Sequence, residues 1–278
     1  MRLFFRLIII VAIATSLIYF SLPHKTVAEQ VRDRSVEVLA YGAMGTGVII
    51  TRGDRNYVWT DAHVVESSRV ASSMMFFGEV YVYFKPVVVR SFVIKNGVIV
   101  GRHDSEAEVI RYSDSSHEDL ALLEIKEHNF SKEDTVWNIS NLPPAIGTNI
   151  SHFGFMRGLS GCFSTGVVSQ PSVISRNIVF DRTSLITLNG GSGGGMYDSD
   201  GACIGLLDGI YVRYGVESGI NNIIPARRIK AYAKRVGVMW AINPYVAMPS
   251  DVHSKIEETN TFYRYRDWSS FVGDLETE

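Results

Sequence analysis

Three polar side chains lie in local sequences that suit nucleophilic catalysis. Ser192 lies within residues 189–195, in which five of the seven residues are glycine. Upstream, His63 follows an apolar strand-like run, and Asp119 immediately precedes the apolar run 120–125. A serine hydroxyl is a poor nucleophile at neutral pH, so it needs a base that takes its proton and a third group that orients the base. Histidine, aspartate and serine in this order predict such a triad, with His63 as the base.

The glycines around Ser192 have a physical purpose in this prediction. Attack of the serine on a carbonyl creates an oxyanion, which backbone N–H groups stabilise if a turn free of Cβ atoms presents them. The N–H groups of Gly190 and Ser192 are the expected pair. Asp119 is expected at the start of a buried strand, where a carboxylate needs a partner such as His63.

The run 190–194 also fits the pattern G-x-S-x-G of a nucleophile elbow. That arrangement needs a helix after the serine and then an acid and a histidine downstream. Residues 196–205 instead continue as strand, turn and strand, and the one downstream histidine is His253 in a polar tail. The pattern therefore disfavours an elbow.

The rest of the chain must supply a core that positions these residues. Its 278 residues are 46% hydrophobic and 20% charged, which is typical of a globular protein with one large or two small domains. The net charge of −2 excludes a broad basic surface for nucleic acid. The densest basic cluster, with Arg227, Arg228, Lys230, Lys234 and Arg235, is expected to be a solvated helix face.

Short apolar or alternating runs separated by turn residues predict β-strands in both halves of the chain. The pair Asn96-Gly97 is a hairpin signal, and Pro143-Pro144 marks a linker between the halves. In the first half the expected strands are 36–41, 47–51, 57–60, 80–84, 87–89, 92–95, 98–100, 106–112 and 120–125. In the second half they are 149–153, 166–169, 177–181, 195–197, 203–207 and 219–224.

After Pro225 the apolar residues fall at helical spacing until Gly237. Two β-rich halves and a terminal helix predict an all-β fold of two six-stranded antiparallel Greek-key barrels with a C-terminal helix. We expect the barrels at residues 35–142 and 145–225, the helix at 226–240 and an irregular tail at 241–278.

The N-terminal residues predict export. Arg2 and Arg6 flank the apolar run 7–22, and small residues precede Ala28. This is typical of a signal peptide at residues 1–28 that is cleaved after Ala28. The alternative is a retained anchor at residues 3–22, in which Arg6 snorkels to the interface. In either case the body of the protein is expected to be extracytoplasmic, either periplasmic or secreted.

The two cysteines, Cys162 and Cys203, leave two interpretations open. In an exported protein they are candidates for a disulfide. Otherwise both are small buried hydrophobic residues in strands.

Six motifs together resemble the trypsin-like serine peptidases and are most similar to the HtrA/DegP-like branch. The resemblance covers about residues 45–237 and implies two barrels, with His63 and Asp119 from the first meeting Ser192 from the second. It implies hydrolysis of protein or peptide substrates through an acyl-enzyme, without a cofactor or metal. The motifs are GTGVII (45–50), WTDAHVV (59–65), DLALLEI (119–125), STGVVS (164–169), GGSGGGM (190–196) and GACIGLL (201–207).

Several residues depart from the family pattern. Gly191 stands where relatives activated by N-terminal cleavage carry an aspartate, so that activation route is not expected. Asp208 stands where the family usually has serine or threonine. It either places a second carboxylate beside Asp119 or turns outward. About 40 residues follow Gly237, too few for the PDZ domain of HtrA-like proteins, and the extra length before Asp119 is expected in hairpins within residues 80–100.

The resemblance also suggests the residues of the substrate pocket. Ile186 stands where trypsin has an acidic pocket base, and Leu207 where relatives that cut after Glu or Gln carry histidine. Ile210 stands where a glycine usually leaves the pocket open. Together they predict a shallow apolar pocket that favours small aliphatic residues at P1.

We therefore expect an exported or membrane-anchored serine endopeptidase. The alternative is a latent or slow protease-fold binding protein, because a loop with five glycines loses more entropy when it adopts the oxyanion conformation. A general esterase that uses the same triad is a third possibility.

Overall fold

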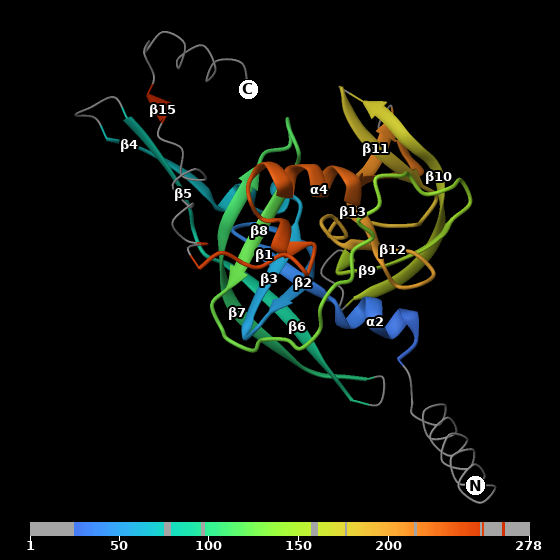
Figure 1. The fold of residues 1–278 in the computed structure, drawn as a ribbon, viewed down its shortest axis with the longest axis horizontal. Coiled ribbons are helices and arrows are strands. Elements are labelled where there is room, and N and C mark those ends of the chain that lie inside the picture. The colour runs from blue at the N-terminus through green and yellow to red at the C-terminus, as the bar shows by residue number, and fades with distance from the viewer. Residues whose placement is uncertain are drawn as a thin grey trace, which may run out of the picture.

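A computed structural model describes residues 25–74, 79–95, 98–156, 161–175, 177–213, 216–250, 252 and 263–264. These residues form two closed, six-stranded antiparallel barrels that lie side by side (Figure 1). The predicted fold class is therefore confirmed.

The first barrel carries the candidate histidine and aspartate. It closes because β1 pairs with both β2 and β6. Around the barrel the strands are β1 (Ser35–Ala40), β2 (Ala43–Arg52), β3 (Arg55–Thr60), β8 (Leu120–Ile125), β7 (Val98–Ser113) and β6 (Val87–Lys95).

The second barrel carries the candidate nucleophile. Its short strand β12 begins three residues after Ser192 and pairs with β9 and β13. The strands are β10 (Cys162–Ser175), β11 (Ile178–Thr183), β14 (Val216–Pro225), β13 (Cys203–Arg213), β12 (Gly195–Tyr197) and β9 (Asn149–Gly154).

Much of the extra chain between His63 and Asp119 forms a separate small sheet. β4 (Arg69–Met74) and β5 (Glu79–Phe84) make a hairpin that projects from the first barrel, and β15 (Tyr263–Arg264) pairs with β5 (Figure 1). This hairpin begins upstream of the range predicted for the extra length. The Asn96-Gly97 turn lies outside the described residues, between β6 and β7.

Several strands are longer than the sequence predicts. The runs 87–89 and 92–95 form one strand, β6, and the runs 98–100 and 106–112 form one strand, β7. β8 is buried along its whole length, which explains why all its residues are apolar except Glu124, whose buried carboxylate pairs with Arg55. β7 and β10 alternate more, because one face of each meets solvent.

Helices join the barrels. α4 (Ala226–Arg235) lies across the top of both in Figure 1 and confirms the predicted helix. One cluster of buried residues includes Trp59 of β3, Leu206 of β13 and Tyr232 of α4. The barrels and the helix therefore share a core. α4 ends five residues before the predicted end at 240, and a separate 3-10 turn at Met239–Ala241 spans the predicted boundary between helix and irregular tail.

The helix α2 (Val27–Asp33) was not predicted from the sequence. Thr26 caps it, because its side chain accepts from the backbone N–H of Glu29 while the Glu29 carboxylate accepts from the N–H of Thr26. This reciprocal pair satisfies two donors at the helix start. Residues 1–24 lie outside the description. Among the residues described, no helix is long and apolar enough to cross a membrane.

Cys162 and Cys203 are both free in the structure. Cys162 lies in β10 and Cys203 in β13. The second interpretation of the pair, two buried residues in strands, therefore holds for Cys203, whereas Cys162 lies in a strand but is only partly buried. Cys203 is fully buried, and burial raises the pKa of its thiol to about 12, so it stays protonated.

Candidate active site

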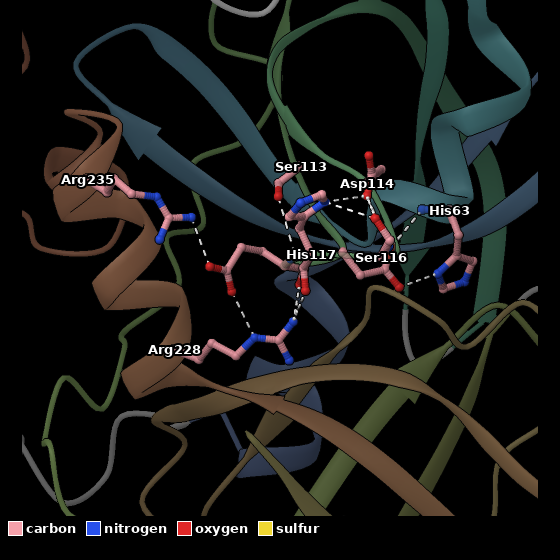
Figure 2. Close-up of polar contacts among 9 residues, drawn as sticks. His63, Ser113, Asp114, Ser116, His117, Arg228 and Arg235 are labelled. Atoms are coloured by element: carbon pink, nitrogen blue, oxygen red, sulfur yellow. Dashed lines mark hydrogen bonds and ion pairs between the residues drawn. The ribbon is translucent and has the colours of Figure 1, made fainter. Parts of the chain in front are cut away.

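The structure brings His63 and Asp119 into direct contact. His63 lies in the single-turn helix α3 (Ala62–Val65) directly after β3, and Asp119 precedes β8. Asp119 Oδ2 lies 2.8 Å from His63 Nδ1, and Asp119 Oδ1 accepts from the backbone N–H of His63 at 2.9 Å. Because an ionised carboxylate only accepts, His63 Nδ1 carries a proton and Nε2 is left as the acceptor. Figure 2 shows His63 at one side of this network.

The charges around His63 keep it basic. Burial works to lower the pKa of His63, but the hydrogen bond and charge of Asp119, with smaller contributions from Asp208 and Glu66, raise it overall above the usual value. Burial works to raise the pKa of Asp119, but its bonds to His63 hold it below the usual value. The pair is therefore an ionised carboxylate beside an imidazole suited to accept a proton.

Ser192 lies in the glycine turn, and the first barrel holds this turn in place. Thr46 of β2 donates its backbone N–H to the Ser192 carbonyl at 2.8 Å and its hydroxyl to the Gly190 carbonyl at 2.7 Å. The Ser192 hydroxyl donates to the Asp208 carbonyl at 3.2 Å rather than to His63 Nε2. The sequence predicts that all three residues meet at one site. In this conformation the structure forms the histidine–aspartate contact but not the serine–histidine hydrogen bond.

The expected oxyanion donors are available. Within the described ranges, neither the N–H of Gly190 nor that of Ser192 donates to another group of the chain. Gly190 has a φ of +98°, a conformation that side chains rarely adopt. Both N–H groups are thus free to receive a ligand oxygen beside the serine.

Comparisons with known proteins agree with this geometry. The profile of the trypsin-like peptidase domain matches residues 45–206, which contain all three residues of the predicted triad. This chain belongs to the trypsin-like peptidase family. A probable serine protease do-like from Buchnera aphidicola is 27% identical over 194 residues, covering 68% of this chain and 34% of that protein. The chain thus spans about a third of the length of that curated relative.

Two solved structures share the fold of this trypsin-like peptidase. The serine endoprotease from Yersinia pestis has a TM-score of 0.54 at 22% identity and covers 79% of this chain and 68% of its own. The Rv3671c protease in its inactive form has a TM-score of 0.53 at 18% identity and covers 76% of this chain and 92% of its own. At these identities the likeness concerns the fold.

In this peptidase Asp208 turns inward, which decides between the two alternatives that the sequence leaves open. The register of β13 shifts between Leu207 and Gly209, so Asp208 lies at an irregularity that re-aims its side chain. The carboxyl shares a hydrogen bond with Asp119. Burial, together with the charge of Asp119, raises the pKa of Asp208 to about 6. Asp208 is therefore the member of the pair that holds a proton in mildly acidic solution.

Asp61 is a third carboxyl of the site, and sequence reasoning missed it. It is fully buried, and burial, with the charges of Asp119 and Asp208, raises its pKa well above the usual value. Donor atoms of Asp61, His63 and Asp119 lie within 4.8 Å of one another, a spacing that suits a metal ion. A cation there would have to displace the bond between His63 and Asp119. The sequence did contain a signal for a further carboxyl at the site, because Asp61 lies only two residues before His63.

His152 of β9 is a second residue that the sequence did not single out. It is fully buried beneath the turn and its Nδ1 lies 3.0 Å from the Gly195 carbonyl. A Cβ atom on Gly194 would lie 2.4 Å from the imidazole. Burial lowers the pKa of His152 to about 4, so the ring is neutral and acts as packing under the turn.

The predicted pocket residues lie in different environments. Ile186 is 76% exposed, whereas Leu207 is buried in the core of the second barrel. Ile210 lies in β13, and its side chain is outside the part of the chain that the structure describes. The pocket as a whole stays a prediction.

The basic cluster on α4 corrects a sequence prediction. A solvated face was expected, and Lys234 and Arg235 are exposed as predicted, but the side chains of Arg227 and Arg228 are only 17% and 10% exposed. Arg227 pairs with the buried Asp181, and Arg228 pairs with Glu118, the residue before Asp119. Their positive charges are needed there because Asp181 is buried and Glu118 is only partly exposed. Charge density alone could not reveal this.

Proposed function

We propose that the protein is a serine endopeptidase that hydrolyses peptide bonds through an acyl-enzyme. Ser192 is the nucleophile, His63 the general base and Asp119 the group that orients the base. The observation that carries the proposal is the pair of hydrogen bonds that Asp119 accepts from His63, from the ring Nδ1 at 2.8 Å and from the backbone N–H at 2.9 Å. It fixes the tautomer in which Nε2 accepts a proton.

The proposed steps follow from these positions. Ser192 Oγ attacks the substrate carbonyl carbon as its proton passes to His63 Nε2. The N–H groups of Gly190 and Ser192 stabilise the resulting oxyanion. The intermediate then collapses, the C–N bond breaks and the leaving amine takes the proton from His63. Water, deprotonated by His63, attacks the acyl-enzyme and releases the acid.

Ser192 must rotate about its χ1 angle before it can attack. In the structure its hydroxyl bonds the Asp208 carbonyl at 3.2 Å. This observation favours a second candidate function, a latent peptidase or a binding protein in which a partner orders the turn. In the peptidase proposal, the hydroxyl leaves the Asp208 carbonyl and moves to another of the three staggered wells of the side chain to meet His63 Nε2.

For the substrate we propose a protein or peptide with a small aliphatic P1 residue. Ile186 supports this, because an exposed apolar side chain lies where a charged pocket base would select Arg or Lys. A peptide library that showed strict cleavage after Arg, Lys or Glu would contradict the proposal.

We further propose that the protein works outside the cytoplasm and keeps its N-terminal segment as an anchor. Cleavage after Ala28 would remove the Thr26 cap of α2. It would also remove Lys25, which forms ion pairs with Asp33 and Glu133. N-terminal sequencing of the protein recovered from a membrane fraction tests this. A mature chain that begins at residue 29 would contradict the anchor.

Peptide turnover by the full chain beside Ser192→Ala tests the catalytic proposal. The wild type should cleave peptide amides, and the variant should lose about 10⁶-fold in kcat. Comparing amide with simple ester substrates separates a peptidase from a general esterase. Equal residual turnover by both proteins would exclude Ser192 as the nucleophile.

A further inference from the structure

Arg228 of α4 reaches from the helix beside the second barrel to the chain segment before Asp119. Its Nε donates to Glu118 Oε2 at 2.9 Å, and its Nη2 donates to the carbonyls of Glu118 at 2.6 Å and His117 at 3.0 Å. Figure 2 shows Arg228 and Arg235 extending from the helix toward the turn that carries His117, with His63 on the far side of that turn.

The second barrel holds the guanidinium of Arg228 in turn. The guanidinium carbon lies 4.9 Å from the centre of the Phe180 ring in β11, and Nη1 donates to the Val179 carbonyl at 3.4 Å. Arg235 donates to the other carboxylate oxygen of Glu118 at 2.8 Å. Both oxygens of Glu118 are therefore engaged by α4. Because the Arg228 fork is rigid and planar, these contacts fix direction as well as distance.

Asp119 needs such support because its backbone is strained. Its φ is +53°, in the left-handed region that a non-glycine residue rarely adopts because of the steric cost. Its N–H donates to the Asp114 carbonyl at 3.0 Å, and the N–H of Glu118 donates to the Ser113 hydroxyl at 3.3 Å. Strained residues persist only where their surroundings over-determine them, and Arg228 contributes three of the bonds to this turn.

We propose that Arg228 is a positioning residue for the triad: by holding Glu118 and the turn before it, Arg228 fixes the carboxylate of Asp119 against His63. The helix of the second barrel thereby sets the geometry of the acid–base pair in the first. This proposal rests on the proposed role of Asp119.

Electrostatics adds to the geometry. Burial raises the pKa values of Asp61 and Asp208 overall, and the charge of Arg228 works against this rise at both carboxyls, joined by His63 at Asp208. Burial works to raise the pKa of Glu118, but the bonds from Arg235 and Arg228 hold it below its usual value. Glu118 is therefore ionised, and its contacts with the two arginines are ion pairs. Arg228 therefore also offsets the negative charge gathered around His63.

Arg227 offers a matched control on the same helix. It binds Asp181 through two bonds of 2.7 and 2.8 Å and is almost as buried as Arg228, but its contacts stay within the second barrel. Arg227→Met and Arg228→Met each remove a largely buried cation from an ion pair. Both variants should lose thermal stability.

The two variants should differ in catalysis. Arg228→Met should lower kcat about 100-fold with little change in KM, because a displacement near 1 Å has an effect of that order. Arg227→Met should keep kcat within about threefold of wild type. The low-field NMR signal of the His63 Nδ1 proton should persist in Arg227→Met and broaden or disappear in Arg228→Met.

Two further variants keep the proposal open to contradiction if Arg228→Met does not fold. Arg228→Lys keeps the charge but cannot serve the carboxylate and two carbonyls together, so its kcat should fall about tenfold. Added guanidinium at low millimolar concentration should partly restore the kcat of Arg228→Ala.

Equal kcat and equal NMR spectra for the variants at 227 and 228 would overturn the proposal. Absence of turnover in the wild type would instead contradict the proposed function, and the NMR signal would still report on Arg228.

Discussion

The two halves of the candidate site differ in how far they are assembled. In the first barrel, His63 and Asp119 already share two hydrogen bonds, and the turn before Asp119 is held by α4. In the second barrel, the Ser192 hydroxyl bonds the Asp208 carbonyl and must turn toward His63. The difference follows from charge. An ionised carboxylate bonds an imidazole strongly, whereas a neutral hydroxyl exchanges partners at little cost.

This contrast indicates that the Ser192 side chain still has to change its hydrogen-bond partner, whereas the His63–Asp119 pair already has its hydrogen bonds. The proposed oxyanion donors lie in a turn of glycines that packs against His152 and Thr46. The acid–base pair is built on α3 and on the residue before β8. Substitutions in the two halves should therefore fail in different ways.

The largest effect is expected from Asp119→Asn in the assembled half. The amide would donate to His63 Nδ1 and leave the proton on Nε2, so His63 could no longer accept from Ser192. We expect kcat to fall about 10⁴-fold with the fold retained, measured by peptide turnover and circular dichroism.

Asp114→Asn is the matched control. Its carbonyl, which holds the N–H of Asp119, is unchanged, and its side chain bonds exposed partners. Its activity should stay within about threefold of wild type. A similar loss in both variants would mean that the tautomer of His63 is not what matters.

The next effect is expected from Gly194→Ala in the serine half. The added Cβ would lie 2.4 Å from His152 Cε1 and 2.9 Å from Thr46 Cγ2, so the turn must shift. Activity should fall about 10²- to 10³-fold as the oxyanion donors move, and the free energy of unfolding should drop by about 1–3 kcal/mol. Active-site titration and thermal melting measure the two losses.

Gly101→Ala in β7 controls for the loss of a glycine. Its nearest side-chain atoms lie 3.9 Å away, and it should change neither quantity measurably. If Gly194→Ala retained full activity, the close packing of the turn would not be needed for the oxyanion site.

A smaller effect, a change in stability that depends on pH, is expected from Asp208→Asn. Asp208 contacts both halves, since its carbonyl bonds Ser192 and its carboxyl bonds Asp119. Folding raises the pKa of Asp208 from 3.8 to about 6, so its proton favours the folded state below pH 3.8 and this contribution is lost as pH rises through about 6. The variant does not titrate there. Its stability relative to wild type should therefore rise by about 2 kcal/mol between pH 4 and pH 7.

The same substitution should move the pH–rate profile. The charge of Asp208 is among the causes that raise the pKa of His63. Its removal should shift the acid limb of kcat/KM down by about half a pH unit. Asp200→Asn, in an exposed turn, should leave both profiles unchanged. An upward shift in Asp208→Asn would contradict the inward position of the carboxyl.

The smallest effect is expected from Ile186→Ala at the predicted pocket. Its side chain is 76% exposed, so a P1 residue would cover only part of it, and kcat/KM for small aliphatic P1 residues should fall about fivefold or less. Ile174 of β10 is similarly exposed, at 70%, and Ile174→Ala should leave kcat/KM unchanged. Equal values for both variants would remove Ile186 from the pocket.

The sequence predicts the triad because each residue carries a local signal. Ser192 lies among glycines, Asp119 opens an apolar run, and the strand patterns around them alternate in the way that barrels need. The inward turn of Asp208 could not be predicted, because it depends on an irregularity in the pairing of β13 with β14. The neutral His152 depends on glycines from a distant turn. The burial of Arg228 depends on a partner 110 positions away.

The most direct test of the account is covalent labelling of the full chain by a fluorophosphonate probe, beside Ser192→Ala and His63→Ala. The account predicts that the wild type is labelled on Ser192 and that neither variant is. Labelling of the wild type alone would mean that His63, Asp119 and the glycine turn form a reactive site without an activating partner. A wild type that is not labelled, or a Ser192→Ala variant that is labelled equally, would contradict the claim that His63 activates Ser192 in this protein.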